Sequence, residues 1–234
     1  MDKAKVLFTS EISEDLMSRS DFPEFEIAPF IRVKKSFDSV KLLSFINDYR
    51  PEVIALSSKN ALEGYEYVNR NANFEHDLVL ISTKLEGSLS QINTHAHIAE
   101  NPNSESIADL IIANFKNKRI LHLNGNLRSE ELSDRLKKSK INAENYNVYK
   151  TEFLSPELNI EDYQSVVFTS YSVIDSFFSK YSLNSNQTAF SIGSKTSTYL
   201  RSKWKGKIIE SENSSLIELI EKIVKHYDSY HVEN

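Results

Sequence analysis

The sequence predicts an α/β fold made of two similar domains, each a parallel sheet flanked by helices. Three observations support this prediction. Short apolar stretches alternate with amphipathic stretches along most of the 234 residues, which is typical of strands and helices that build parallel sheets. Polar turns rich in Ser, Thr and Asn follow the apolar stretches. The order of these segments then recurs in the second half of the chain.

The composition suits a globular protein. Hydrophobic residues make up 40% and charged residues 26% of the chain, and cysteine is absent, which excludes disulfides and thiolate metal sites. The net charge of −5 and the dispersed Lys and Arg residues argue against nucleic-acid binding. The five glycines are too far apart for a GxGxxG or P-loop motif. No membrane span or signal pattern is visible, so we expect a cytoplasmic protein and, by default, a monomer.

The elements follow in order along the chain. Residues 6–10 predict a strand and residues 12–17 a short helix. Residues 25–35 predict an edge strand or a connector, because Pro29 cannot donate to a sheet. Residues 37–49 have apolar positions at helical spacing, and residues 144–154 are extended again. Strand, turn and helix are predicted within each of the segments 51–65, 77–92, 97–115, 119–139, 166–178, 189–204 and 207–227.

Four segments of the first half match four segments of the second half in the same order. The matched pairs begin at Val6 and Ile120, Val53 and Val166, Leu80 and Ser191, and Ile98 and Ile208. The offset stays at about 110 to 114 residues, which indicates a duplicated α/β unit.

The two extended stretches suggest that the chain crosses between the domains twice. We predict a first domain of residues 1–28 plus 155–234 and a second domain of residues 36–143. Residues 29–35 and 144–154 would form a two-stranded antiparallel β connector. Two domains on such a connector leave a cleft between them, and clefts between domains are preferred ligand sites.

Hydroxyl and amide side chains gather where the predicted strands end. They are Ser57, Ser58, Asn60, Ser82, Thr83, Asn124, Asn126, Thr169, Ser170, Ser172, Ser194, Thr196, Asn213 and Ser215. Parallel strands place these turns at one edge of each sheet, where helix N-termini and backbone N–H groups bind anions. Helix capping is the alternative explanation for each turn, and both interpretations stay open.

Candidate acids and bases are sparse. His95 and His97 alternate, but no further residue stands at metal-ligand spacing, so we expect no metal site. His122 lies in the middle of a predicted strand, where we expect it to be packed or to be hydrogen-bonded at a sheet edge. Tyr149 lies in the second extended stretch, where its phenol could donate a hydrogen bond into the cleft; packing on the connector is the alternative.

An ordered set of motifs across nearly the whole chain resembles the uroporphyrinogen-III synthase family. FTSYSVIDSFF, SIGSKTSTYL and IIESENSSLIELIE are similar to the carboxyl half of that family. GNLRSEEL resembles its G-N-x-R-x-x-L turn, NVYKT its V-Y-x-T crossing, and VIALSSKNAL its T-S-x-N-A-V turn. The chain departs from the family pattern at Glu11, after the first strand, and at Leu85, where the first half usually has threonine.

The resemblance implies a lyase that needs no cofactor. Its substrate would be hydroxymethylbilane, a linear tetrapyrrole polycarboxylate, which loses water and closes to uroporphyrinogen III with inversion of the last ring. Tyr149 would assist departure of the hydroxyl group. Carboxylates would be bound in one domain by Thr169, Ser170, Ser172, Gly193, Ser194 and Thr196, and in the other by Ser58, Asn60, Gly125, Asn126 and Arg128. A non-enzymatic two-domain binding or sensor protein remains the alternative.

Overall fold

The chain folds into two compact units. The computed structural model describes residues 4–13, 22–89 and 96–232, with side chains up to residue 228. Unit 1 is Met1–Arg32 with Glu152–Asn234, and unit 2 is Val33–Thr151. Each unit contains a largely parallel sheet with helices against it, which confirms the predicted fold class.

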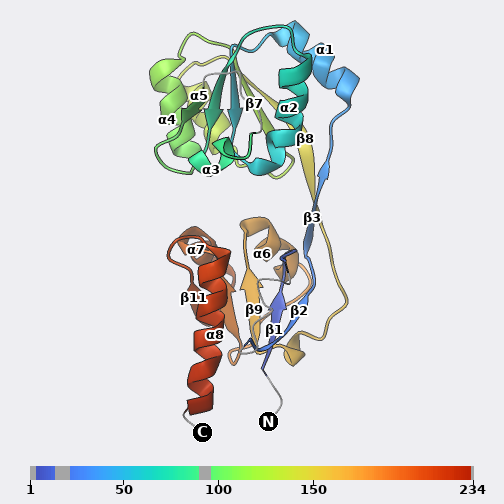
Figure 1. Ribbon diagram of the computed structural model, residues 1–234, viewed down its shortest axis with the longest axis vertical. Helices are drawn as coiled ribbons and strands as arrows, with labels where there is room; N and C mark the ends of the chain where they lie inside the picture. Colours follow the sequence, from blue (N-terminus) through green and yellow to red (C-terminus); the bar gives the residue numbers. More distant parts are fainter. Residues whose placement is uncertain (1–3, 14–21, 90–95, 233–234) are drawn as a thin grey trace. The chain divides into compact units, whose positions relative to one another are not determined.

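Unit 1 has a five-stranded parallel sheet in the order β11-β10-β9-β1-β2 (Figure 1). Its strands are β1 (Lys5–Phe8), β2 (Glu24–Ile27), β9 (Ser165–Phe168), β10 (Thr188–Ser191) and β11 (Lys207–Glu210). Its helices are the 3-10 turn η3 (Ile160–Asp162), α6 (Tyr171–Phe178), α7 (Ser194–Lys203) and α8 (Leu216–Val232).

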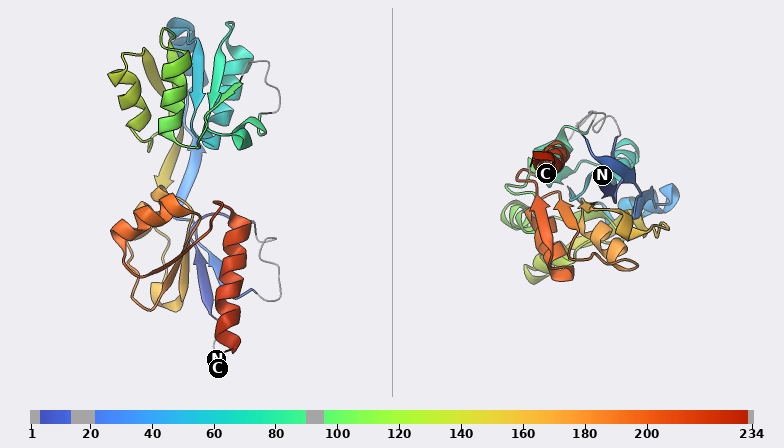
Figure 2. Two further views of the ribbon diagram at one scale, coloured as in Figure 1. Left: turned by 90° about the vertical axis from the view of Figure 1, so that its left-hand side faces the viewer. Right: turned by 90° about the horizontal axis from the view of Figure 1, so that it is seen from below.

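Helices cover both faces of the unit 1 sheet. Leu7 and Val166 pack against α6 and α7, whereas Val6 and Val167 pack against α8, and all four side chains are fully buried. Figure 2 shows this layering from two further directions. Because successive strand residues point to opposite faces and both faces are covered, the strands consist of continuous apolar runs.

Unit 2 has a six-stranded sheet in the order β3-β8-β7-β4-β5-β6. Its strands are β3 (Ile31–Lys35), β4 (Val53–Leu56), β5 (Asp77–Leu80), β6 (Ala96–Ile98), β7 (Ile120–Gly125) and β8 (Ala143–Phe153). Its helices are α1 (Ser39–Tyr49), the 3-10 turn η2 (Lys59–Ala61), α2 (Leu62–Asn71), α3 (Thr83–Glu86), α4 (Ser104–Asn114) and α5 (Glu131–Lys138). Ile54 and Leu56 pack against α1 and α2, and Val53 and Ala55 pack against α4 and α5.

The two sheets share one strand order. The series β6-β5-β4-β7-β8 of unit 2 corresponds to β11-β10-β9-β1-β2 of unit 1. Each of the four segment pairs matched in the sequence therefore supplies strands at equivalent positions, as a duplication requires.

The strand register corrects one of these matches by a single residue. Ile120 pairs with Val53 in unit 2, and its counterpart Val6 pairs with Ser165 in unit 1. Val53 therefore corresponds to Ser165, and not to Val166. The helix caps agree with this register, because Ser58 and Ser170 both occupy N-cap positions and are offset by the same distance along the chain.

The stretch predicted as extended over residues 25–35 forms two strands. β2 is the parallel neighbour of β1, and β3 is the neighbour of β8. Pro29, which has no N–H to donate, lies between the two strands. The backbone N–H of Leu154 donates to Phe30 O at 2.8 Å and that of Ser36 donates to Val148 O at 3.0 Å, so β3 and β8 run antiparallel.

A buried serine fixes these two strands where they leave unit 1. Ser176, in the middle of α6, is fully buried. Its Oγ lies 2.6 Å from Phe30 O and 3.0 Å from Leu154 O, so one hydroxyl serves both strands.

Two predicted helices are only partly described. α3 begins at Thr83 and ends at Glu86, so it is earlier and shorter than the helix predicted for residues 85–92, and residues 90–95 lie outside the described residues. The short helix predicted for residues 12–17 falls mostly outside them as well. Within the described ranges, every helix is too short or too polar to cross a lipid bilayer.

Candidate active site

The turn after β9 in unit 1 carries a cluster of hydroxyl groups. Ser170 is the N-cap of α6 and accepts a hydrogen bond from the backbone N–H of Val173 at 3.4 Å. Its Oγ also lies 3.1 Å from Ser172 Oγ. Thr169 Oγ1 lies 2.5 Å from Ser10 Oγ, which joins the ends of β9 and β1. The capping interpretation of Ser170 is therefore confirmed.

The turn after β10 brings three further predicted residues to the start of α7. Gly193 is the N-cap residue, and a Cβ at this position would overlap Ser214 Oγ. Ser194 is exposed in the first turn of the helix. Thr196 is only 7% exposed, so little of its side chain is open to a ligand.

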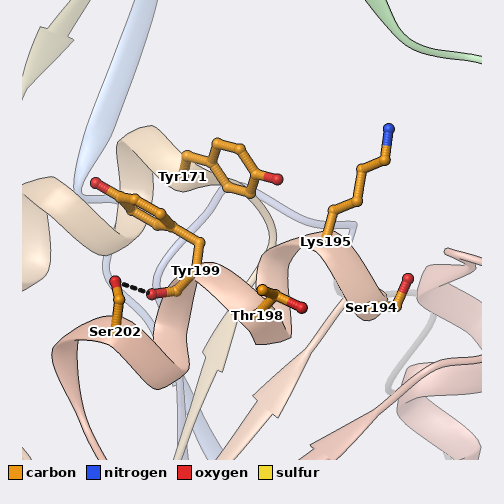
Figure 3. Close-up of a pocket in the computed structure, with 6 residues that line it drawn as sticks. All are labelled: Tyr171, Ser194, Lys195, Thr198, Tyr199 and Ser202. Carbon is orange, nitrogen blue, oxygen red and sulfur yellow. Dashed lines mark hydrogen bonds between the residues drawn. The ribbon is translucent and has the colours of Figure 1, made fainter.

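A pocket of about 550 Å³ opens between α6 and α7 (Figure 3). It is lined by Tyr171, Ser194, Lys195, Thr198, Tyr199 and Ser202. Of these, only Ser194 was predicted from the sequence. The signal for the α7 residues was their helical spacing, because positions 195, 198, 199 and 202 share one helix face.

An aspartate outside the pocket lining binds Tyr199, one of the two tyrosines of the pocket. The Tyr199 hydroxyl donates to Asp175 Oδ1 at 2.6 Å, and Lys203 Nζ lies 3.1 Å from the same oxygen. The hydrogen bond to Asp175 raises the pKa of Tyr199, and the same carboxylate raises the pKa of Lys203. Lys203 also lies over the Tyr199 ring, 5.3 Å from its centroid.

In unit 2, the structure brings Gly125 and Tyr149 together. β7 ends at Gly125, which pairs with Tyr149 of the parallel strand β8. A Cβ on Gly125 would lie 2.5 Å from Cζ and 2.7 Å from Cδ2 of Tyr149, so the ring lies directly across the glycine. The Tyr149 side chain is half-buried, and its hydroxyl has no hydrogen-bond partner within the part of the chain that the structure describes.

The other predicted residues after β7 are engaged by the protein itself. Asn126 Oδ1 accepts from the backbone N–H of Thr151 at 2.7 Å, and Asn126 Nδ2 donates to Thr151 O at 3.1 Å. Arg128 lies 3.2 Å from Glu130 Oε1 and lines a second pocket, of about 520 Å³, beside the start of α1 and β8. Its Nε is buried without a partner among the described residues.

The turn after β4 repeats the arrangement of unit 1. Ser58 is the N-cap of η2 and accepts from the backbone N–H of Asn60 at 3.2 Å. Both side chains are half-buried at the carboxyl end of β4.

A buried histidine lies beneath this turn, as expected for His122, which is 4% exposed. Its Nε2 lies 2.8 Å from Ser57 Oγ and its Nδ1 lies 3.2 Å from Asn145 Oδ1. Burial lowers the pKa of His122 to about 4, so the ring is neutral near pH 7. Asn124 Nδ2 also lies 3.2 Å from Nδ1, and it donates to Asn145 Oδ1 at 2.9 Å, so the histidine, the serine and the two asparagines form one network. Sequence reasoning missed this network, although His122 and Asn124 alternate on one strand face.

The structure offers no metal centre among the residues that it describes. No group of three His, Asp or Glu side chains lies close enough to hold an ion there. His97 packs its ring against Phe115, with centroids 4.9 Å apart, and His95 lies outside the described residues.

The fold and its turns define a class of protein: a duplicated α/β protein whose hydroxyl and backbone N–H groups stand at the carboxyl ends of two parallel sheets. The family described as "Uroporphyrinogen-III synthase HemD" matches residues 21–221. The chain belongs to the uroporphyrinogen-III synthase family, a family of lyases in haem biosynthesis. This membership favours the enzyme over the alternative of a non-enzymatic binding or sensor protein.

Solved structures agree at the level of the fold. Uroporphyrinogen-III synthetase from Helicobacter pylori is 17% identical, with a TM-score of 0.56 over 95% of this chain and 99% of that chain. A variant of uroporphyrinogen III synthase from Thermus thermophilus is 11% identical, with a TM-score of 0.70 over 97% and 99%. The wild-type Thermus thermophilus enzyme is 12% identical, with a TM-score of 0.57 over 98% and 99%. A search of curated protein sequences found no match.

Proposed function

We propose that the chain works as a uroporphyrinogen-III synthase in which Tyr149 assists the loss of the hydroxyl group and the turns at the sheet edges bind carboxylates. The substrate is hydroxymethylbilane and the product is uroporphyrinogen III. Water leaves the terminal hydroxymethyl group, and the resulting cation closes the ring through a spiro intermediate that inverts the last pyrrole.

The position of Tyr149 carries this proposal. Its ring lies across Gly125 at the end of β7, and its hydroxyl has no partner among the described residues. A phenol hydroxyl that is not already hydrogen-bonded, and that lies beside the carboxyl end of a parallel strand, can donate a hydrogen bond to a departing hydroxyl group. Because loss of that group from a pyrrole-stabilised carbon is easy, the main task of the enzyme is to hold one conformation of a flexible substrate.

Helix capping and carboxylate binding are compatible roles for the serines in the turns. Ser170 accepts the N–H of Val173 through an oxygen lone pair, and the hydrogen bond between Ser170 and Ser172 uses one hydroxyl proton, which leaves the second hydroxyl proton of the pair to donate to a ligand. The same holds for Ser58, which accepts the N–H of Asn60. We therefore assign the predicted carboxylate contacts to these turns, together with the starts of the helices that follow them.

The roles of the remaining predicted residues differ in kind. Gly125 and Gly193 allow a neighbouring side chain to approach. Asn126 supports the turn through the backbone of Thr151, and Arg128 provides a cation for a carboxylate at the second pocket. The carboxyl edge of the unit 1 sheet has three further hydroxyl groups, those of Thr169, Ser194 and Thr196.

We further propose the domain boundaries, the cellular location and the oligomeric state. Residues 1–28 plus 155–234 and residues 36–143 act as domains, and residues 29–35 and 144–154 connect them. The protein works on its small-molecule substrate as a cytoplasmic monomer without a cofactor. Light scattering of the purified protein tests the monomer, and a second copy in solution would contradict it.

The function is tested by incubating the purified protein with hydroxymethylbilane and separating the uroporphyrin isomers after oxidation. Isomer III is expected, and isomer I alone would refute the proposal. Tyr149→Phe should lower kcat about 100-fold or more with folding unchanged, since general acid assistance typically contributes about 100- to 10,000-fold. Tyr67→Phe is the matched control, because Tyr67 packs its ring on Phe37 in the same unit and should leave kcat unchanged.

A further inference from the structure

We propose that the pocket between α6 and α7 binds one carboxylate-bearing pyrrole ring of the substrate, with the Tyr171 ring as its stacking surface and Lys195 as its cation. This inference rests on the proposed function and extends it. Tyr171 and Lys195 occupy positions that the resemblance to the family leaves undefined, since the motif there specifies only the serine of the first turn, the glycine and Thr196.

The Tyr171 ring is exposed and yet supported. It is 46% exposed and lies 4.8 Å from the Tyr199 ring, centroid to centroid, at an interplanar angle of 31°. Tyr199 is itself fixed by its hydrogen bond to Asp175 and by Lys203 above its ring. A planar ligand ring can therefore stack on Tyr171 with little loss of side-chain freedom, which is how aromatic side chains add to affinity.

Of the two lysines near the pocket, Lys195 is the one available to a ligand. Lys203 is committed to Asp175, 3.1 Å away. Lys195 lines the pocket, is exposed, and has no ion-pair partner within the described residues. Since Lys203 and the Tyr199 hydroxyl already compensate the charge of Asp175, the pocket keeps an uncompensated positive charge on Lys195.

The hydroxyl groups of Thr198 and Ser194 complete the subsite. Figure 3 shows the Tyr171 hydroxyl directed toward the Lys195 side chain, with Thr198 below the space between them and Ser194 beyond Lys195. Ser202 is excluded as a ligand group, because its hydroxyl donates to Tyr199 O at 2.6 Å. The volume of about 550 Å³ is in the range of small-molecule sites, so a substituted pyrrole has room to lie on Tyr171 with one carboxylate arm at Lys195.

The test compares the wild-type protein with Lys195→Gln and Tyr171→Leu. The readouts are KM and kcat for hydroxymethylbilane, and Kd for uroporphyrin III, the stable oxidised product, from fluorescence titrations at low and high salt. Lys195→Gln should raise KM and Kd about threefold to tenfold, and the effect should shrink at high salt because a charge pair is screened. Tyr171→Leu should raise Kd by a similar factor at both salt concentrations, and Tyr171→Phe should restore it.

Lys205→Gln is the matched control, because Lys205 is exposed in the same unit and contacts the backbone of Arg201. It should leave KM and Kd unchanged. If Lys195→Gln and Tyr171→Leu bind uroporphyrin III as the wild type does while the wild type forms isomer III, the subsite is wrong and the function stands. If the wild type forms only isomer I, the function itself is wrong.

Discussion

Replacing Gly125 by alanine tests whether the position of the Tyr149 hydroxyl limits the reaction. The new Cβ would stand 2.5 Å from Cζ and 2.7 Å from Cδ2 of the Tyr149 ring. Carbon atoms in ordinary contact lie about 3.5–4.0 Å apart, so the ring has to move by about 1 Å or turn to another rotamer. Either response displaces the hydroxyl from its present place.

The expected loss of stability and the expected loss of rate both follow from this geometry. Overpacking of this kind costs about 1–3 kcal/mol of stability, which a folded unit 2 can tolerate. A displacement of about 1 Å of a group that acts on the reacting atoms lowers the rate on the order of 100-fold. We therefore expect Gly125→Ala to reduce kcat far more than it reduces the folded fraction.

The assay measures the rate of uroporphyrinogen III formation and the ratio of isomers III and I, together with urea unfolding of each variant. Gly87→Ala is the matched control, since its new Cβ would approach no atom of the described residues closer than 3.8 Å, at Thr83 O. In the double variant with Tyr149→Phe, the two losses should not add, because both remove the same hydroxyl group from its place. A folded Gly125→Ala protein with wild-type turnover would refute the reasoning.

Three further predictions concern stability and its separation from activity. Burial lowers the pKa of His122 from about 6.5 to about 4, so the stability that its neutral ring contributes is present above pH ~6.5 and is lost as the pH falls toward 4, by on the order of 3 kcal/mol. Urea unfolding should show a shallower pH dependence of stability for His122→Gln than for the wild type. An identical pH dependence would contradict the lowered pKa of His122. Asn126→Ala removes two hydrogen bonds to Thr151 and should lower unfolding stability by about 1–2 kcal/mol; a rise in KM at unchanged stability would show instead that the amide binds substrate. Ser176→Ala should cost about 1 kcal/mol in the same assay, since its buried hydroxyl serves two strands, and a neutral result would mean that those carbonyls find other donors.

The sequence predicted the fold class because each strand–turn–helix segment has its own local signal. Buried parallel strands are apolar throughout, as in Val166 and Val167, and the serines that follow them cap helices. These local signals do not determine which residues of the two sheets are equivalent. Matching by similarity aligned Val53 with Val166, whereas the hydrogen-bonded register aligns Val53 with Ser165. Neighbouring small and apolar residues resemble one another, so only the strand pairing decides between them.

The candidate site was predicted less completely, because its contacts join residues that are far apart in sequence. Tyr149 meets Gly125 only through the pairing of β8 with β7, which includes a register shift next to Gly125. Asn126 has an amide side chain of the kind that binds substrates, but this amide hydrogen-bonds to the backbone of Thr151. Lys195 stands on a polar helix face that the sequence displays, yet the spacing alone does not say that this face meets Tyr171.

The Ser176 hydroxyl has a mechanical consequence. It ties α6 to Phe30 and Leu154, the residues at which both crossing strands leave unit 1. At their other end, the same strands are joined by the Ser36–Val148 hydrogen bond. Between these two ties, β3 and β8 are hydrogen-bonded neighbours in the sheet. Because a short helix moves as a rigid rod, we expect any torque on the pair to reach the first turn of α6, where Ser170 stands.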